Sequence, residues 1–442
     1  MTATTDSNAA MDIDTDTTVD EILLAATNHD TNKLRTLLKE ASDPRLLANA
    51  QDPDTGYTPL HAAIAACEDD EEADDEGKSA GDAIHNRALP EEAAKETVKL
   101  LFEYGAIWNE LDFNDETPGC LALRLGMKNV YEAIVEAGVR AEMLFGRMDS
   151  YLPLADDEGA EEVVEVTEEL GGAKQPSVPG AEIEITEVVD SSVPELKAAG
   201  ADGADAPDES AGPVHLKNPN VNSADYLTSK LTYSQDRLLD EDKNAVMMDW
   251  EDEIMGRSVD AMVKKEGLRT MNVGHGMGIV DGKFLDKNPS MHHIIEAHPE
   301  VIERMKEKGW MDKPNVTVHQ GKWQDVLPKL AEQGVVLDAI YYDTYAEDYS
   351  DLKEFFADHV IGLLDPQGKF GFYNGLGADR QVCYDVYTKV SELDLFEAGL
   401  DTEWEVLNVP DLDGEGQWKG VRRKYWDVDV YRLPTCSFIA SA

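Results

Sequence analysis

The sequence predicts two folded parts: an all-α region at the N-terminus and an α/β domain with a doubly wound sheet at the C-terminus. Residues 18–148 show helical periodicity and two copies of a short motif. Residues 214–442 alternate short apolar runs with longer amphipathic stretches, a pattern typical of βαβ units. At 442 residues the chain also exceeds what one hydrophobic core usually supports, so we expect more than one domain.

The composition is strongly acidic, with 90 acidic and 39 basic residues and a net charge of -51. This charge argues against nucleic acid or an anionic membrane as the main partner and favours a basic protein. The four cysteines form no CxxC pair, so neither a disulfide framework nor a metal site is expected. Because no signal peptide or membrane-spanning stretch is evident, we expect a soluble intracellular protein.

The N-terminal region carries a repeat motif after a polar tail of residues 1–17. Residues 58–63 read TPLHAA, which resembles the ankyrin motif, and residues 117–122 read TPGCLA, a degraded copy. The copies start 59 residues apart instead of about 33, so we infer an acidic insertion at about residues 67–92. The sequence thus predicts an ankyrin-repeat domain over residues 18–148, which either binds a partner protein or only stabilises the second domain.

Residues 149–213 are predicted to form a disordered linker. Between residues 154 and 212 there is no aromatic side chain, and Asp, Glu, Gly, Ala, Pro and Ser predominate. Such a segment cannot bury enough apolar surface to fold alone. We interpret it as a spacer, with an acidic tether for a basic substrate as the alternative.

The C-terminal domain, residues 214–442, shows a regular order of strands and helices. Strands are expected at residues 268–273, 293–296, 316–319, 337–343 and 369–373, and helices near residues 278, 299, 323, 351 and 378. Two further strands, at residues 404–409 and 426–433, are expected to form a hairpin with a short loop. An antiparallel hairpin of this kind is typical of class I methyltransferases.

A glycine-rich turn, Gly274-His275-Gly276-Met277-Gly278, follows the first of these strands and precedes a helix. Such a turn lets the backbone approach a ligand closely while the helix N-terminus supplies donors. The local pattern is also compatible with dinucleotide binding, since Glu296 follows 18 residues later, where an acid can hold ribose hydroxyls. The turn alone does not distinguish a ligand with a methionine sulfonium from a dinucleotide with a pyrophosphate.

Five ordered motifs give the domain a closer resemblance. The stretches VMMDWE (246–251), VGHGMGI (273–279), IIEAH (294–298), GKWQDV (321–326) and YDTY (342–345) resemble guanidinoacetate N-methyltransferase, over about residues 225–435. Together with ankyrin repeats, the chain resembles the fungal type IV protein arginine N-methyltransferases. The resemblance implies S-adenosylmethionine as methyl donor and an arginine δ-nitrogen in a basic protein, such as a ribosomal protein, as acceptor. It also implies a monomer found in cytoplasm and nucleus.

The resemblance also implies a set of residues around the methyl donor. These are Tyr226, Met247, Met255, Gly274, His275, Gly276, Met277, Gly278, Ile279, Glu296, Ala297, His298, Gly321, Lys322 and Asp343. Met247 and Met255 are expected on one helical segment, with two core methionines as the alternative. We expect His275 to fill space, because the sequence shows no orienting partner for it, and Trp323 to be a core aromatic at a helix start.

Glu251 and Asp343 are the predicted catalytic residues. An arginine pKa of about 12.5–13.8 makes deprotonation at pH 7 cost on the order of 8 kcal/mol. Two carboxylates can orient the guanidinium by paired hydrogen bonds, and one can accept its proton. Asp343 ends a strand at the carboxyl edge of the sheet, where doubly wound folds bind ligands.

Two departures from the metabolite enzyme bear on the acceptor. Here Asp252-Glu253-Ile254 follows Trp-Glu instead of Thr-Pro, and Leu376-Gly377 stands where a Thr-Ser pair lies near the substrate. Both changes favour a larger substrate without a free carboxylate, as a peptide arginine would be. The alternatives are a guanidino-metabolite methyltransferase with an ankyrin appendage, and an ankyrin scaffold with an inactive methyltransferase domain.

Overall fold

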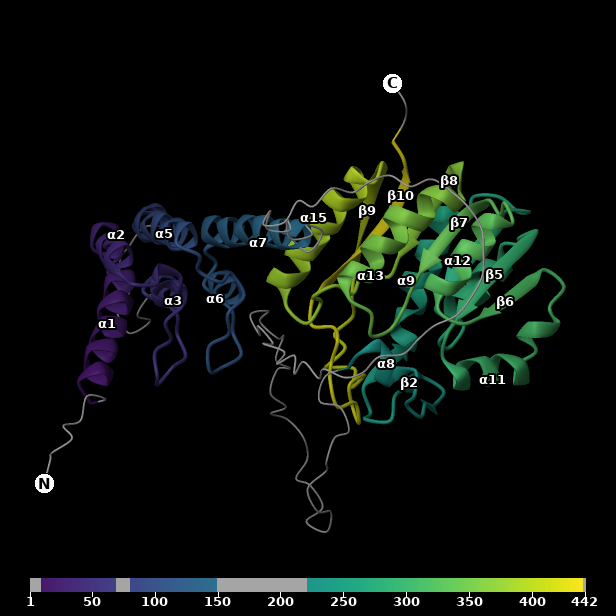
Figure 1. Ribbon diagram of the computed structural model, residues 1–442, viewed down its shortest axis with the longest axis horizontal. Helices are drawn as coiled ribbons and strands as arrows, with labels where there is room; N and C mark the ends of the chain where they lie inside the picture. The colour runs from purple at the N-terminus through teal and green to yellow at the C-terminus, as the bar shows by residue number, and fades with distance from the viewer. Residues whose placement is uncertain (1–8, 69–79, 149–220, 440–442) are drawn as a thin grey trace, which may run out of the picture.

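The computed structural model describes residues 9–68, 80–148 and 221–439 (Figure 1). The predicted linker of residues 149–213 and residues 69–79 of the predicted acidic insertion lie outside these ranges. The described chain forms a helical region, residues 9–68 and 80–148, and an α/β domain, residues 221–439. The two parts lie side by side, and helix α7 of the first packs against helix α15 of the second.

The helical region contains no strand in its described residues. Its helices are α1 (Ala9–Thr27), α2 (Thr31–Glu40), α3 (Pro44–Ala48), α4 (Pro59–Ala65), α5 (Ala80–Glu103), α6 (Pro118–Arg124) and α7 (Lys128–Met148). Helix α1 begins inside the predicted tail of residues 1–17, and α5 begins inside the predicted insertion of residues 67–92. Both starts are rich in alanine, which has the highest helix propensity.

Two of these helices begin at the Thr-Pro pairs, as the sequence predicts. Thr58 and Thr117 are the N-cap residues of α4 and α6, and a proline follows each at the first helical position, where a missing N–H costs nothing. The buried ring of His61 accepts a hydrogen bond from Thr58 N through Nδ1 at 3.2 Å. Its Nε2 donates to the carbonyl of Glu116 at 3.1 Å, so His61 connects the two motif-bearing loops.

The α/β domain is built on a seven-stranded mixed sheet in the order β6-β5-β4-β7-β8-β10-β9. Its strands are β4 (Arg269–Val273), β5 (Met291–Glu296), β6 (Val316–Gln320), β7 (Leu337–Tyr342), β8 (Leu364–Phe372), β9 (Leu400–Asn408) and β10 (Val430–Phe438). The first five are parallel, and β10 runs antiparallel to β8 and β9. This doubly wound, Rossmann-like sheet matches the prediction, but the connection from β9 to β10 spans residues 409–429 and is not the short loop expected.

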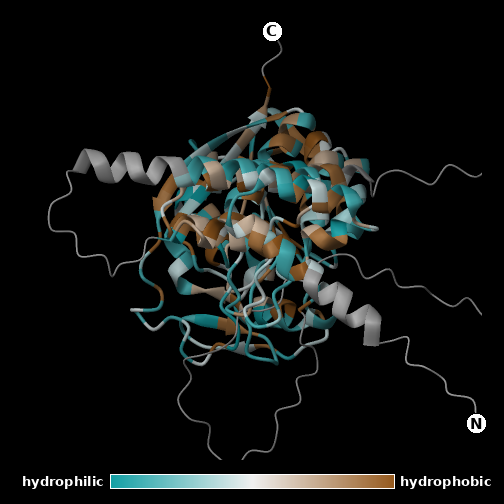
Figure 2. Cartoon of the chain, turned by 90° about the vertical axis from the view of Figure 1, so that its left-hand side faces the viewer, coloured by the Kyte–Doolittle hydropathy of each residue, from teal (hydrophilic) through white to brown (hydrophobic). Residues whose placement is uncertain are grey.

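Helices cover both faces of this sheet. They are α9 (Asp252–Met262), α10 (Ile279–Asp286), α11 (Pro299–Glu307), η2 (Trp310–Asp312), α12 (Trp323–Glu332), α13 (Tyr349–Glu354), η3 (Phe355–Val360), α14 (Ile361–Leu363) and α15 (Gln381–Glu397). Strand β7 shows the two-sided burial: Ala339 and Tyr341 pack with α9 and α10, and Ile340 and Tyr342 pack with α12 and η3. Figure 2 shows hydrophobic segments gathered in the interior.

A small antiparallel sheet precedes the main sheet. It comprises β1 (Thr232–Tyr233), β2 (Arg237–Leu239) and β3 (Ala245–Met248), preceded by α8 (Ser223–Tyr226). Strand β3 continues into the short helix η1 (Asp249–Glu251) and then α9. This path brings Glu251 close to the carboxyl ends of the central strands.

The helical region and the α/β domain share one hydrophobic core. Val382, Val386 and Val390 of α15 are buried in the same cluster as Leu121 of α6 and Ile134 of α7. The contact is close, since a Cβ built on Gly119 in α6 would lie 2.5 Å from Val382 Cγ2.

A hydrogen bond also links the helical region to the α/β domain, because Tyr131 Oη of α7 donates to Asp385 Oδ2 of α15 at 2.5 Å. Among the described residues, no helix is both long and apolar enough to cross a membrane.

Candidate active site

Two adjoining cavities lie at the carboxyl ends of β4, β5 and β7. The donor cavity, as we name the first, is lined by Ser223, Tyr226, Leu227, Val246, Met247, Val273, Gly274, Gly276, Ile295, Glu296, Ala297, Gly321, Lys322, Trp323, Asp343, Thr344, Tyr345 and Glu347. The acceptor cavity is lined by Ala245, Val246, Glu251, Tyr342, Asp343, Thr344, Tyr345, Glu347, Asp348, Leu352, Tyr373, Gly375, Leu376 and Tyr425. Asp343 belongs to both, so the cavities meet at one of the predicted catalytic residues.

The glycine loop between β4 and α10 forms one wall of the donor cavity. Gly274 has a φ of +91°, and a Cβ built on it would lie 1.8 Å from the carbonyl oxygen of Asp343. Only glycine allows this approach of two strand ends. Gly278, with a φ of +81°, is the N-cap of α10, and Ile279 is the first residue of that helix. Gly274 and Gly276 line the donor cavity, so the backbone of the loop borders it directly.

His275 has an orienting partner, so the expectation that it lacks one is wrong. Its Nδ1 lies 2.5 Å from Oδ2 of the fully buried Asp281, whose Oδ1 lies 2.8 Å from Nε2 of His292. Burial alone would raise the pKa of Asp281, but its contacts with His275 and His292 lower it. Thr270 continues the chain, with its hydroxyl 2.7 Å from His292 Nδ1. This buried network fixes the glycine loop from behind.

Glu296 ends β5 and faces the donor cavity. Its Oε2 accepts a hydrogen bond from His275 N at 2.8 Å, and its Oε1 accepts one from His298 N at 2.7 Å. Each carboxylate oxygen can accept more than one hydrogen bond. Glu296 is thus rigidly placed, with acceptor capacity left for hydroxyl donors such as those of a ribose.

Tyr226 closes one side of the donor cavity, with His298 behind it. His298 Nδ1 accepts from Glu300 N at 3.1 Å, so its Nε2 is assigned as the donor to the carbonyl of Tyr226 at 3.0 Å. The tyrosine ring lies 4.8 Å from the His298 ring, centroid to centroid. Tyr226, Ala297, Gly321 and Lys322 line the cavity directly, whereas His298 lies behind Tyr226.

The two methionines lie in different elements, so the prediction that they share one helical segment is wrong. Met247 belongs to strand β3, because residues 245–248 pair with β2, and Met255 lies in α9. Met247 lines the donor cavity, and its sulfur accepts a hydrogen bond from Met277 N at 3.2 Å. Met255 is fully buried in the core under β7 and does not line either cavity.

Glu251 and Asp343 both face the acceptor cavity. Tyr425 donates a short hydrogen bond to Glu251 Oε1, and Tyr373 Oη lies 3.5 Å from the same oxygen. Burial, together with the charge of Asp343, raises the pKa of Glu251 well above its ordinary value. Burial and the charge of Asp281 raise the pKa of Asp343 to about 7, and its buried Oδ2 has no hydrogen-bond partner among the described residues. These carboxyl groups are suited to binding a cation and accepting a proton.

Tyr373, Tyr425 and Glu347 are among the residues of the acceptor cavity that were not predicted from the sequence. Tyr373 follows β8, Tyr425 lies in the long connection before β10, and Glu347 lies in the loop after β7. The motif that contains Asp343 could have suggested Glu347, which is only four residues further on. Nothing local marks Tyr425, which reaches Glu251 across 174 residues of sequence. Trp323 is buried at the start of α12, as predicted, but its edge also lines the donor cavity.

Comparison with known proteins agrees with this geometry. A family model described as guanidinoacetate N-methyltransferase matches residues 223–402. The protein named protein arginine N-methyltransferase 2 of Aspergillus fumigatus is 53% identical over 428 residues, which cover 96% of this chain and 97% of that protein. Its namesake in Emericella nidulans is 52% identical over 438 residues, covering 98% and 100%. The match extends along both described parts, and the chain therefore belongs to the protein arginine N-methyltransferase 2 family.

Proposed function

We propose that this chain is an S-adenosylmethionine-dependent protein arginine N-methyltransferase that transfers one methyl group to the δ-nitrogen (N5) of an arginine in a basic target protein. The observation that carries the proposal is the chemistry of the acceptor cavity. Its polar lining consists of carboxyl groups, tyrosine hydroxyls and one threonine, with no Lys, Arg or His among the described residues that line it. Such a cavity favours a cation over an anion.

The apolar part of the acceptor cavity fits an arginine within a peptide. Leu352 and Leu376 provide surface for an aliphatic stem, and no basic lining residue is available to pair with a substrate carboxylate. Guanidinoacetate carries a free carboxylate, whereas a peptide arginine does not. The relatives named protein arginine N-methyltransferase 2 support the same acceptor class.

The donor cavity fits S-adenosylmethionine. Glu296 would accept hydrogen bonds from the ribose hydroxyls, and the glycine loop would allow close approach of the backbone. Gly321 and Lys322 would address the adenine edge, with Tyr226 closing the cavity. When bound, S-adenosylmethionine supplies a methyl group on a positively charged sulfur.

Glu251 and Asp343 would prepare the acceptor nitrogen. The two carboxyl groups can hold two guanidinium nitrogens by charge-assisted hydrogen bonds. As the N–C bond to the methyl group forms, the S–C bond of the sulfonium would break and leave a neutral thioether. The nitrogen must also lose a proton, and one carboxylate would accept it. A carboxyl group with a pKa of about 7, as for Asp343, is a stronger base than an exposed aspartate. Tyr425 and Tyr373 hold Glu251 in place.

The choice of the δ-nitrogen and of a ribosomal protein as target rests on the family resemblance. We assign the helical region to ankyrin repeats on its two Thr-Pro helix starts and on His61, which connects the motif-bearing loops. In this proposal the repeats bind the basic target protein and the enzyme acts as a monomer.

Incubation with labelled S-adenosylmethionine tests the proposal. Purified full-length protein is offered a basic protein extract in one reaction and guanidinoacetate in another. Label in protein, with a fragmentation spectrum that places the methyl group on the δ-nitrogen, is the expected result. Label only in guanidinoacetate would instead support the metabolite enzyme, which the family-model match over residues 223–402 favours. No binding of S-adenosylmethionine in calorimetry would indicate an inactive domain.

A further inference from the structure

Glu347 lies where the donor and acceptor cavities meet. It is one of five residues that line both, with Val246, Asp343, Thr344 and Tyr345. It belongs to the loop between β7 and α13, four residues after Asp343. Of the side chains shared by the two cavities, only those of Asp343 and Glu347 carry a carboxyl group.

The carboxyl group of Glu347 is held in one orientation by two buried donors. Trp323 Nε1 lies 3.1 Å from both of its oxygens, and Tyr342 Oη donates to Oε2 at 2.5 Å. Trp323 and Tyr342 are only 2% and 5% exposed, so neither donor can turn away to water. Both donors are neutral, so they orient the group without cancelling a negative charge.

The backbone before Glu347 adopts a conformation that non-glycine residues rarely take. Ala346 has a φ of +60°, in the left-handed region. Holding a residue with a Cβ there costs free energy, and such strain persists where the surrounding structure requires it, often at binding sites. The turn at Ala346 directs the chain so that Glu347 reaches the two donors and the cavity.

We propose that Glu347 is a third carboxylate of the acceptor site, which binds the guanidinium of the substrate together with Glu251 and Asp343. This inference rests on the proposed function. A guanidinium presents five N–H donors, and two carboxylates that each pair with two of them leave one donor without an acceptor. Glu347 would accept from a nitrogen that is not methylated and thereby help to decide which nitrogen faces the donor cavity.

The variant Glu347→Gln tests this role, because it keeps the size of the side chain and an oxygen that accepts from Trp323 and Tyr342. Loss of one charge-assisted hydrogen bond is expected to lower kcat/KM for the basic protein substrate about 10- to 100-fold. The proportion of methyl groups on the δ-nitrogen, measured by fragmentation, is expected to fall. Unchanged kcat/KM together with an unchanged methylation site would overturn the proposal, leaving Glu347 as an anchor of the loop.

Calorimetry separates a substrate contact from a donor contact, because Glu347 also lines the donor cavity. S-adenosylmethionine carries a positive sulfur, and S-adenosylhomocysteine does not. If Glu347 serves the acceptor, Glu347→Gln leaves the ratio of their dissociation constants unchanged. A selective loss of affinity for S-adenosylmethionine would show that Glu347 faces the sulfonium, and would also overturn the proposal.

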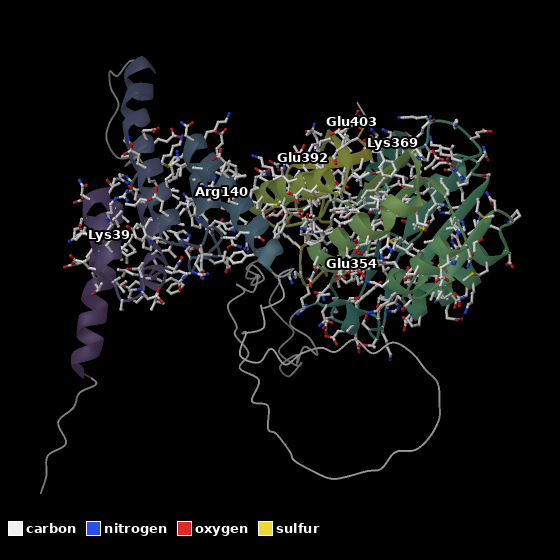
Figure 3. All side chains as sticks on the ribbon, turned by 45° about the horizontal axis from the view of Figure 1, so that its top comes forward. Lys39, Arg140, Glu354, Lys369, Glu392 and Glu403 are labelled. Atoms are coloured by element: carbon white, nitrogen blue, oxygen red, sulfur yellow. The ribbon has the colours of Figure 1, made fainter. Side chains whose placement is uncertain are left out.

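Two further variants serve as controls. Glu354→Gln removes the same charge from an exposed position on α13 (labelled in Figure 3) and is expected to leave all these values unchanged. Tyr342→Phe removes one donor to Glu347, so it should lower kcat/KM in the same direction, and its effect should largely disappear in the Glu347→Gln background. If wild-type protein labels only small guanidino compounds, the proposed function fails, and the same variants then test Glu347 on those compounds.

Discussion

Gly119 of the helical region lies against Val382 of the α/β domain, and Gly119→Ala tests that joint. A Cβ at this position would lie 2.5, 2.9 and 3.2 Å from the three side-chain carbons of Val382. Rotation of Val382 cannot relieve the contact, because its Cβ itself is too near. Overpacking of this kind costs about 1–3 kcal/mol, and the better helix propensity of alanine returns at most about 1 kcal/mol.

We therefore expect Gly119→Ala to lower the free energy of unfolding by about 1–2 kcal/mol, and the midpoint of thermal unfolding by about 2–8 °C. Urea unfolding of the full-length chain, followed by circular dichroism, measures the first quantity. Gly282→Ala in α10 is the matched control, because no atom lies within 4 Å of the Cβ it would add. That variant should be neutral or slightly stabilising.

A double-variant cycle makes the test specific to the joint. Val382→Ala alone should cost about 2 kcal/mol for two buried methyl groups and the cavity they leave. In the double variant the methyl group added at position 119 occupies part of that space, so the combined cost should be smaller than the sum by about 1 kcal/mol or more. Additive costs, or a more stable Gly119→Ala variant, would refute the close contact between α6 and α15.

Further predictions concern the two cavities. The pKa of Asp343 is about 7, so kcat/KM should rise between about pH 6 and 8, and Asp343→Asn should lose both the rate and this rise. Above about pH 4, the carboxyl group of Asp343 keeps its proton in the folded chain but has lost it in the unfolded chain. The free energy of unfolding should therefore fall as pH rises toward 7. Asp343→Asn should weaken this slope in urea titrations, and an unchanged slope would contradict the raised pKa. Glu251→Gln should lower kcat about 100- to 10,000-fold and leave S-adenosylmethionine affinity, measured by calorimetry, nearly unchanged. Glu296→Gln should instead raise the dissociation constant of S-adenosylmethionine about 10- to 100-fold, and an unaltered constant would exclude the assigned ribose contact.

The central strands β4 and β7 are buried almost throughout, and each begins within one residue of the position expected. Strand β6 also begins at the expected residue, although its side chains are only partly buried. Strand β10 was misplaced by about four residues at its start. Trp426 shows the alternation of a strand, yet it is buried in the connection before β10, where its Nε1 donates to the carbonyl of Val428 at 2.7 Å.

The candidate site was predictable where its residues occur in local motifs. Glu296 ends β5, Asp343 directly follows β7, and Glu251 lies in η1 after β3, so sequence position alone brings them near one edge. Contacts between distant segments have no local signal. Asp281 beside His275 is an example, because a buried acid inside an amphipathic helix looks like any exposed acid until the fold shows its partner.

The shared core also accounts for the difference between the two Thr-Pro motifs. Where the first copy has Leu60 and His61, the second has Gly119 and Cys120, and Gly119 is the residue that lies against Val382. The last helices of such a region need a covering element, because they would otherwise expose apolar side chains. Helix α15 occupies that place, with Val382 and Val386 buried against α6 and α7.

The enzyme domain is therefore the terminal cap of the helical region, and the two cannot be exchanged as independent modules. A chain cut between them would leave an apolar surface on both fragments, and each fragment would tend to self-associate. A chimera that carries the helical region to another enzyme would need α15 as well. For the same reason, a substitution in α6 at this joint requires a compatible side chain in α15, although the two helices lie more than 200 residues apart in the chain.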